Sequence, residues 1–522
     1  MNLHQFSILG NFLKAIQSFF KDLKVPMNYV ADEPITPKEI LKDTYKENDT
    51  FELISDVYFV GMVDDAAFTG NSSPDPKNIK SDYDGVLIFG VTLKDRSNGL
   101  LPSRSQLAEI SRAFNREFHF TPVVVVFKYG GYLAFANTER IPYKQEWREG
   151  EKAGRVSLLR DIYIEQPHSG HKRILSELQI PTKGSKKIDS FAGLYTYWQE
   201  VFSVNLLNKK FYQELSNWYF WAIKNVVFPG EPNERDAYVK KGELDELVQE
   251  HRATNVIRML TRLLFVWFIK EKKLIPDELF DLETLQKEIL IDIEPYNQLG
   301  TLYSERNKES VYYKAILQNL FFATLNCPIE ADSLDKRKRG FRKPSSNYGT
   351  LYLMRYEKYF KDKDAFLKLV NDKVPFLNGG LFECLDERGE GEKKDERVWI
   401  DGFSDNLPKD ERLIVPDYLF FGLEEKADLS DIVGIKNKKH KEAAVKGLIN
   451  ILKSYKFTIT ENTPVEEDVA LDPELLGKVF ENLLASYNPE TKTTARKQTG
   501  SFYTPREIVN YNPLGEIKLF EF

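Results

Sequence analysis

Two short runs of almost uninterrupted apolar residues most constrain what this chain can fold into. They are Val86–Leu93 and Val123–Phe127, and a stretch with helical periodicity, Ser103–Phe118, separates them. A strand without polar alternation is typical of burial on both faces of a sheet. The order strand, helix, strand therefore predicts a small α/β domain over residues 1–180.

Segments on both sides of these runs extend the predicted α/β domain. Apolar residues recur at helical spacing in Phe6–Leu23. Sequence patterns typical of β-strands occur at Phe51–Ile54, Val57–Val60 and Tyr132–Ala136. His168 and His171 follow, three residues apart beside a Pro and a Gly. That spacing suits a metal ion, but no third ligand is in view, so we interpret both as loop histidines.

The middle of the chain, residues 185–460, is predicted to be mainly α-helical. Its helices carry aromatic and aliphatic residues at core spacing, and the longest covers more than one face, as in the central helix of a bundle. The predicted helices are Phe191–Leu207, Phe211–Val227, Arg252–Lys272 and Tyr312–Leu325.

Composition bounds the class of protein. The 522 residues have room for about three domains, and a hydrophobic fraction of 42% is ordinary for a globular protein. Cys327 and Cys384 match no metal-binding spacing and predict a reducing compartment without disulfides. No apolar run approaches the roughly 20 residues that a membrane helix needs. We therefore expect a cytoplasmic protein that does not associate with membranes.

Asp84 and Lys94 flank the apolar run Val86–Leu93 and are the candidate catalytic residues. Their arrangement resembles that of metal-dependent α/β nucleases, in which an Asp and an acid-x-Lys surround Mg²⁺. The carboxylates hold the metal and the Lys orients the attacking water. Asp84 is accordingly the candidate metal ligand. Thr92, however, occupies the acid position.

The distance between the two halves of this signature is a second difficulty. In an extended chain Asp84 and Thr92 lie about 26 Å apart, so both reach one ion only if the chain folds back. Asp64, Asp65 or Glu109 is an alternative source of a carboxylate. The sequence leaves open an active nuclease, a nuclease-like fold without activity, and a strand flanked by surface charges.

Two basic segments are candidate DNA-binding surfaces because Lys and Arg contact phosphates without reading sequence. One is the predicted helix carrying Arg104 and Arg112. The other is the run Lys336, Arg337, Lys338 and Arg339. The formal net charge of −6 does not itself indicate nucleic-acid binding. The alternative for the helix is a solvated face, and for the run an exposed loop without a partner.

The most distinctive sequence motif of the chain is Gln498–Glu507, near the end of the sequence. Thr504 is a good helix N-cap, Pro505 suits the first helical position, and Glu507 completes a capping box. Phe502 and Tyr503 place flat rings just before the cap. Such rings can lie against a flat ligand such as adenine, and the alternative is a capped helix packed by two aromatics.

The segment Gly500–Pro505 resembles the cofactor turn of adenine-specific DNA methyltransferases. The segment that precedes this methyltransferase domain in fused, type IIG-like restriction-modification enzymes is similar to Leu471–Leu484 and Tyr487–Pro489. Leu264–Phe268 and Val374–Phe382 resemble their helical connector.

The resemblance implies a nuclease-like domain at 1–180, a helical connector at 185–460, and the first helices of a Rossmann-like methyltransferase at 461–522. It also implies that Phe502, Tyr503, Thr504 and Pro505 contact S-adenosylmethionine, and that the parent protein methylates adenine N6 in double-stranded DNA and cleaves DNA with Mg²⁺.

The family's Gly-rich loop and its Asn-Pro-Pro-aromatic motif do not occur in this sequence. We therefore expect a chain truncated after its first cofactor motif, which cannot methylate alone and which a separate chain could complete. Two alternatives stay open. One is an independently active Mg²⁺-dependent nuclease, and the other is a non-catalytic module that binds DNA or a methyltransferase.

Overall fold

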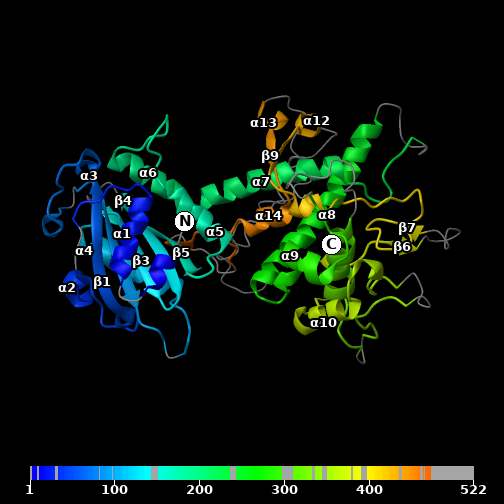
Figure 1. Ribbon diagram of the computed structural model, residues 1–522, viewed down its shortest axis with the longest axis horizontal. Coiled ribbons are helices and arrows are strands. Elements are labelled where there is room, and N and C mark those ends of the chain that lie inside the picture. Colours follow the sequence, from blue (N-terminus) through cyan, green and yellow to red (C-terminus); the bar gives the residue numbers. More distant parts are fainter. Residues whose placement is uncertain are drawn as a thin grey trace, which may run out of the picture. The chain divides into compact units, whose positions relative to one another are not determined.

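The structure, a computed structural model of the chain, divides into two compact units (Figure 1). Unit 1 comprises Met1–Lys210 and Lys453–Asp472, and unit 2 comprises Phe211–Leu452 and Pro473–Phe522. The structure describes residues 3–8, 11–29, 33–80, 83–96, 98–142, 151–234, 243–296, 310–331, 335–343, 350–377, 380–388, 397–433, 438–458, 463 and 465–471.

A six-stranded mixed sheet forms the centre of unit 1. Its strands lie in the order β1, β2, β3, β4, β5, β10. The pairs β2–β3 and β5–β10 are parallel, whereas the other three pairs are antiparallel. The predicted mixed α/β architecture is thus confirmed. The strands are β1 (Ile54–Asp64), β2 (Gly85–Leu93), β3 (Val123–Tyr129), β4 (Tyr132–Pro142), β5 (Glu151–Tyr163) and β10 (Glu466–Asp468).

Helices cover both faces of the sheet, as the apolar character of β2 predicts. Helix α4 (Arg104–Glu117) starts with a capping box between Ser103 and Gln106, and its Phe114 ring stacks on Phe89 of β2 with centroids 4.5 Å apart. Helix α1 (Phe12–Asp22) covers the other face, where a Cβ at Gly90 would lie 2.6 Å from Ile16. Unit 1 also contains α2 (Pro37–Leu41), α3 (Asp65–Thr69), α5 (Ser169–Glu177) and α6 (Phe191–Val201).

Unit 2 is mainly helical. Its longest helix, α8 (Leu244–Glu271), starts eight residues before the predicted helix Arg252–Lys272 and buries Val256, Leu263 and Trp267. The boundary between the units falls within α7 (Val204–Asn225). The other helices are α9 (Leu282–Thr284), α10 (Lys363–Lys373), α11 (Tyr418–Phe421), α12 (Ser430–Val433), α13 (Lys438–Lys441) and α14 (Leu448–Lys453), with π-helical turns at Tyr312–Gln318 and Phe321–Leu325. Two short hairpins pair β6 (Glu387–Arg388) with β7 (Arg397–Val398), and β8 (Glu425–Ala427) with β9 (Ala443–Val445).

The strand β10 brings the late part of the chain back into unit 1. The sequence alone groups residues 461–522 as a separate domain, whereas β10 pairs with β5 at Glu466–Val156 and Asp468–Leu158. Its three residues are all acidic and all buried. Acidic residues are depleted in strands, so this composition does not predict a strand. Among the described residues no helix is long and apolar enough to cross a membrane.

Candidate functional site

The predicted pair Asp84 and Lys94 does not converge. Asp84 immediately precedes β2 and Lys94 immediately follows it, so they are separated by the length of the strand, roughly 30 Å. The strand pairs continuously with β3 from Leu87 to Leu93, and Gly90 makes room for α1 rather than a bend. Because Mg²⁺ binds its ligands at about 2 Å, these two residues do not fit one ion.

The three alternative carboxylates are also engaged elsewhere. Asp64 is buried and accepts hydrogen bonds from Ser73 Oγ at 2.7 Å and from the Tyr83 hydroxyl at 3.0 Å. Asp65 accepts from the backbone N–H of Phe191. Glu109 forms an ion pair with Lys46. Across the described residues, no group of three or more His, Cys, Asp or Glu is placed to hold a metal ion.

The sheet instead brings Asp56 to Thr92. These residues are cross-strand partners on β1 and β2, and the Thr92 hydroxyl donates to Asp56 Oδ2 at 3.1 Å. The next strand places Lys128 opposite Thr92, and two residues beyond Thr92 the Lys94 ammonium donates to the Glu52 carbonyl at 3.0 Å. We call Asp56, Thr92, Lys94 and Lys128 the Asp56 row. Sequence reasoning missed Asp56 because only strand pairing brings it close to Thr92.

The Asp56 row combines one carboxylate, one hydroxyl and two ammonium groups. Lys128 donates to the Phe6 carbonyl at 2.6 Å, and burial lowers the pKa of its ammonium. Desolvation raises the pKa of the Tyr58 hydroxyl two residues along β1 from Asp56, and the negative charge of Asp56 adds to this effect. Chemically, the row can contact an anion through its lysines, while its single carboxylate makes a weak site for a divalent cation.

The predicted DNA-binding arginines of α4 are engaged inside unit 1. Arg112 donates to Glu466 Oε1 at 2.9 Å and to the Val465 carbonyl at 2.7 Å. Arg104 lies 3.9 Å from Glu466 and 4.0 Å from Asp468, and its side chain is only 10% exposed. The acids of β10 thus neutralise both guanidinium groups, so these residues do not form the free basic face expected from the sequence.

The residues of the basic run in unit 2, Lys336–Arg339, differ in their exposure and in their partners. Arg339 is 3% exposed and donates to backbone carbonyls, including those of Thr324 and Val374, and burial lowers its pKa to about 10. Arg337 pairs with Asp335, and Lys338 forms an exposed ion pair with Glu330. Lys336 is exposed. Arg339 therefore serves the core of unit 2 and is not a surface phosphate ligand.

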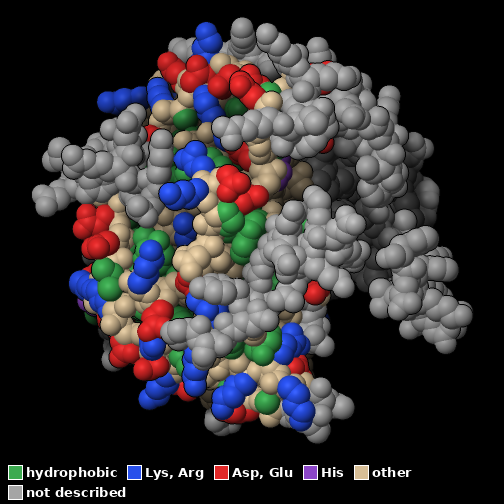
Figure 2. All heavy atoms as spheres, turned by 90° about the vertical axis from the view of Figure 1, so that its right-hand side faces the viewer, with side chains coloured by type: hydrophobic (Ala, Val, Ile, Leu, Met, Phe, Trp, Pro, Cys, Tyr) green, Lys and Arg blue, Asp and Glu red, His purple; other side chains and the backbone are tan. Residues whose placement is uncertain are grey.

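The face of the molecule drawn in Figure 2 carries surface charges of both signs among its described residues. Figure 2 shows Lys and Arg side chains interspersed with Asp and Glu over the face that it draws. An interspersed pattern gives weaker long-range attraction to DNA than a continuous basic field does. This face therefore presents no continuous basic field among its described residues.

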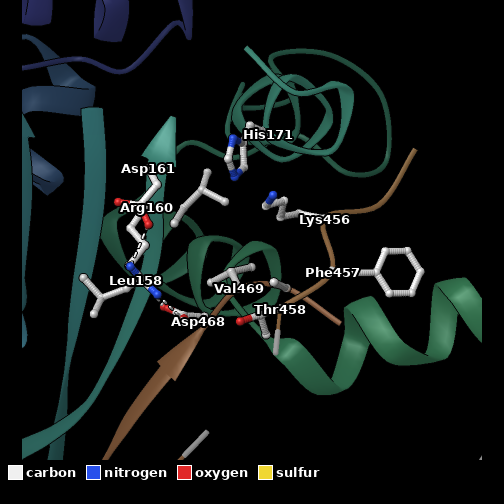
Figure 3. Close-up of a pocket in the computed structure, with 11 residues that line it drawn as sticks. Leu158, Arg160, Asp161, His171, Lys456, Phe457, Thr458, Asp468 and Val469 are labelled. Carbon is white, nitrogen blue, oxygen red and sulfur yellow. Dashed lines mark hydrogen bonds and ion pairs between the residues drawn. The ribbon is translucent and has the colours of Figure 1, made fainter. Parts of the chain in front are cut away.

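A small cavity lies where β5, α5 and the segments at 456–458 and 468–470 meet, all within unit 1 (Figure 3). Its volume is about 120 Å³, well below the roughly 300 Å³ of the smallest drug-sized sites. Close packing of α5 forms one wall, because a Cβ at Gly170 would lie 2.6 Å from the backbone nitrogen of Lys456. The cavity can hold water or a small ion, but not a nucleotide.

His171 is the most perturbed group at this cavity. It belongs to α5 and is 3% exposed, so the interpretation of it as a loop histidine is wrong. Burial, with smaller effects from the positive charges of Lys456 and His168, lowers the pKa of His171 to about 3. Its Nδ1 has no hydrogen-bond partner among the described residues. Figure 3 shows the ring and the Lys456 side chain directed toward the cavity.

An ion-pair network closes the opposite side of the cavity. Arg160 of β5 donates to Asp468 Oδ1 at 2.9 Å and to Asp161 Oδ2 at 2.6 Å (Figure 3). Asp161 also accepts from the Tyr129 hydroxyl at 3.0 Å. The network links β10 to β5 through Arg160 and Asp468, on the side of the cavity away from His171.

The predicted cofactor residues Phe502, Tyr503, Thr504 and Pro505 lie outside the described residues. The contact with S-adenosylmethionine therefore stays a prediction. Comparisons of the chain with family models, curated proteins and solved structures gave no match.

Proposed function

We propose that this chain is the DNA-binding portion of a restriction-modification protein that methylates adenine N6, and that its sheet domain binds DNA without cutting it. The Asp56 row is the observation that carries the proposal. Its strands bring an Asp opposite a Thr-x-Lys sequence, which resembles a nuclease centre whose second acid is replaced by a hydroxyl. The segment Gly500–Pro505 supports the link to adenine methylation.

The chemistry of the row favours binding over cleavage. Mg²⁺-dependent hydrolysis needs carboxylates that hold the ion next to the scissile phosphate. Asp56 is the one acid in this row, and its Oδ2 already accepts from Thr92. The two lysines can still contact phosphate oxygens directly. A duplex bound there would thus be held by its backbone, with no strong metal site beside it.

A labelled duplex tests this proposal with the full chain. We expect binding that weakens as salt rises, and no cleavage in Mg²⁺. Lys94→Ala should weaken binding, whereas Lys38→Ala, which removes an exposed lysine elsewhere in unit 1, should not. Mg²⁺-dependent cleavage that disappears in Asp56→Asn would instead establish an active nuclease.

A second carboxylate tests whether the row occupies a nuclease-like position. Thr92→Asp places this acid opposite Asp56, and we expect tighter binding of Mn²⁺ in a calorimetric titration. Ser185→Asp is the matched control, because Ser185 is exposed in the loop between α5 and α6 and lies outside the sheet. Equal Mn²⁺ affinity in the two variants would remove the support that the row gives to the proposal.

The cofactor part of the proposal concerns Phe502, Tyr503, Thr504 and Pro505. We propose that they form one wall of a site for S-adenosylmethionine, with the flat rings next to the adenine. Binding of the cofactor to the chain, measured by calorimetry, is expected to weaken in Tyr503→Ala. A chain whose cofactor affinity does not change in this variant would exclude this wall.

A further inference from the structure

A second pocket lies at the end of the sheet, next to the Asp56 row and entirely within unit 1. It is bounded by Lys94–Arg96 and Gly99–Pro102, which follow β2, and by the turn Tyr129–Tyr132 that joins β3 to β4. Its volume is about 190 Å³, which suits one flat ring system but not a whole drug-sized ligand. We call it the Tyr132 pocket.

Tyrosine rings form a continuous aromatic series at this end of the sheet. Tyr129 and Tyr132 have centroids 6.2 Å apart and planes inclined by 17°, and Tyr163 follows Tyr132 at 5.4 Å. Tyr129 is fixed by its hydrogen bond to Asp161. Tyr163 is 38% exposed. The series therefore runs from the core to the surface, and its rings at Tyr129 and Tyr132 line the pocket, where a further flat ring can stack.

The turn between β3 and β4 keeps this aromatic surface open. It consists of two glycines, and Gly130 has a left-handed φ of +52°, which favours glycine. A Cβ at Gly131 would lie 3.3 Å from the ring of Tyr163. Side chains at the turn would thus strain the backbone and crowd the ring, whereas glycines leave room for a ligand.

The polar groups of the pocket are of both signs. Lys94 is exposed and also belongs to the Asp56 row. Arg96 donates to the side chain of Gln106, which holds its guanidinium at the start of α4. The Asp95 carboxylate lies close to the turn: a Cβ at Gly130 would be 3.2 Å from Asp95 Oδ1. The pocket thus offers cations for a phosphate and a carboxylate for a group that donates hydrogen bonds.

We propose that the Tyr132 pocket binds one unpaired nucleobase of a DNA strand whose adjacent phosphate contacts Lys94. A nucleobase has a flat face that can stack on the tyrosines. It also has amino or imino groups that can donate hydrogen bonds to the Asp95 carboxylate. Leu100, which is 63% exposed, adds apolar surface beside it. Because Lys94 is shared with the Asp56 row, this inference rests on the proposed DNA binding and adds a preference for DNA with unpaired nucleotides.

Fluorescence anisotropy with two labelled DNAs tests the inference on the full chain. One is a fully paired duplex, and the other has the same length with a central unpaired loop. We expect the looped DNA to bind roughly 10-fold more tightly, the scale of one base–aromatic stack. Tyr132→Leu keeps apolar bulk but removes the ring that lines the pocket, and it should bring the ratio close to one. Tyr29→Leu, at another exposed tyrosine of unit 1, should leave it unchanged.

Tyr163→Leu removes the ring that packs against Tyr132 and should likewise reduce the ratio. Circular dichroism checks that both variants fold. Equal affinity for paired and looped DNA in the wild-type chain would overturn the inference but leave the proposed function standing. Binding to neither DNA would refute the proposed function. Competition by free dAMP as effective as that by the looped strand would also overturn the inference, because it would assign the pocket to a free nucleotide.

Discussion

His171 makes a quantitative prediction about pH. Its imidazole is 3% exposed, and burial, together with the charges of Lys456 and His168, holds its pKa at about 3 instead of the ordinary 6.5. The folded protein therefore keeps this histidine neutral, whereas the unfolded chain protonates it below about pH 6.5. Replacing it by a neutral residue should remove one source of acid sensitivity from unit 1.

The sign and size follow from linkage. A group whose pKa is depressed on folding contributes stability that is present above the unfolded pKa and is lost as pH falls toward the folded pKa. With values of 6.5 and about 3, the free energy of unfolding should fall by about 2 kcal/mol between pH 7.5 and pH 5. The full loss, reached only below the folded pKa of about 3, is about 5 kcal/mol.

The assay compares the pH dependence of wild type with that of His171→Gln. Urea unfolding is followed by hydrogen exchange of peptides from α5 and β5, so that the measurement reports on unit 1. The difference between the two proteins should change by about 2 kcal/mol from pH 7.5 to pH 5, whatever its value at neutral pH. The control is His119→Asn, because His119 is exposed and its φ of +53° suits Asn.

Direct titration offers a second measurement. The chain has six histidines, so selective labelling gives resolvable imidazole signals. The His171 signal should stay constant from pH 7.5 to pH 4. A midpoint near 6.5, or an equal pH slope in wild type and His171→Gln, would refute the buried neutral state.

Three further outcomes concern buried contacts. Glu466→Ala leaves the mostly buried Arg112 without its carboxylate and should cost about 3 kcal/mol, seen as faster hydrogen exchange in β10. A double mutant with Arg112→Ala should lose less than the sum of the single losses, and additive losses would contradict the pairing. Arg339→Met leaves several carbonyls unpaired and should lower the urea midpoint of unit 2. An unchanged midpoint would show that they find other donors. Gly447→Ala puts a Cβ 2.4 Å from the Phe420 carbonyl oxygen and should cost about 2 kcal/mol in thermal unfolding, whereas wild-type stability would refute this close approach.

The sequence predicted those parts of unit 1 whose signals are local. The runs that became β2 and β3 are apolar because both of their faces are covered, and α4 shows its Ser103 cap and its periodic core residues within one stretch. Each signal depends on neighbours within about four residues along the chain. These elements could therefore be located without knowledge of their partners.

The candidate sites depended on contacts that local signals do not contain. Asp56 and Thr92 are 36 residues apart and meet only because β1 and β2 pair in one register. The same basic run holds the exposed Lys336 and the buried Arg339, and nothing in its composition distinguishes them. From the sequence His171 is interpreted as a polar loop residue. It is buried because α5 packs against the segment at Lys456.

The sequence by itself determined the mixed α/β class of the first part, the helical class of the middle, and the resemblance carried by Gly500–Pro505. Only the tertiary structure decided that β10 completes the first sheet, although its three residues are acidic. The physical reason is pairing over long sequence separations. Buried carboxylates are costly alone, but Arg112, Arg155 and Arg160 offset their charge. Those partners lie more than 300 residues earlier in the chain.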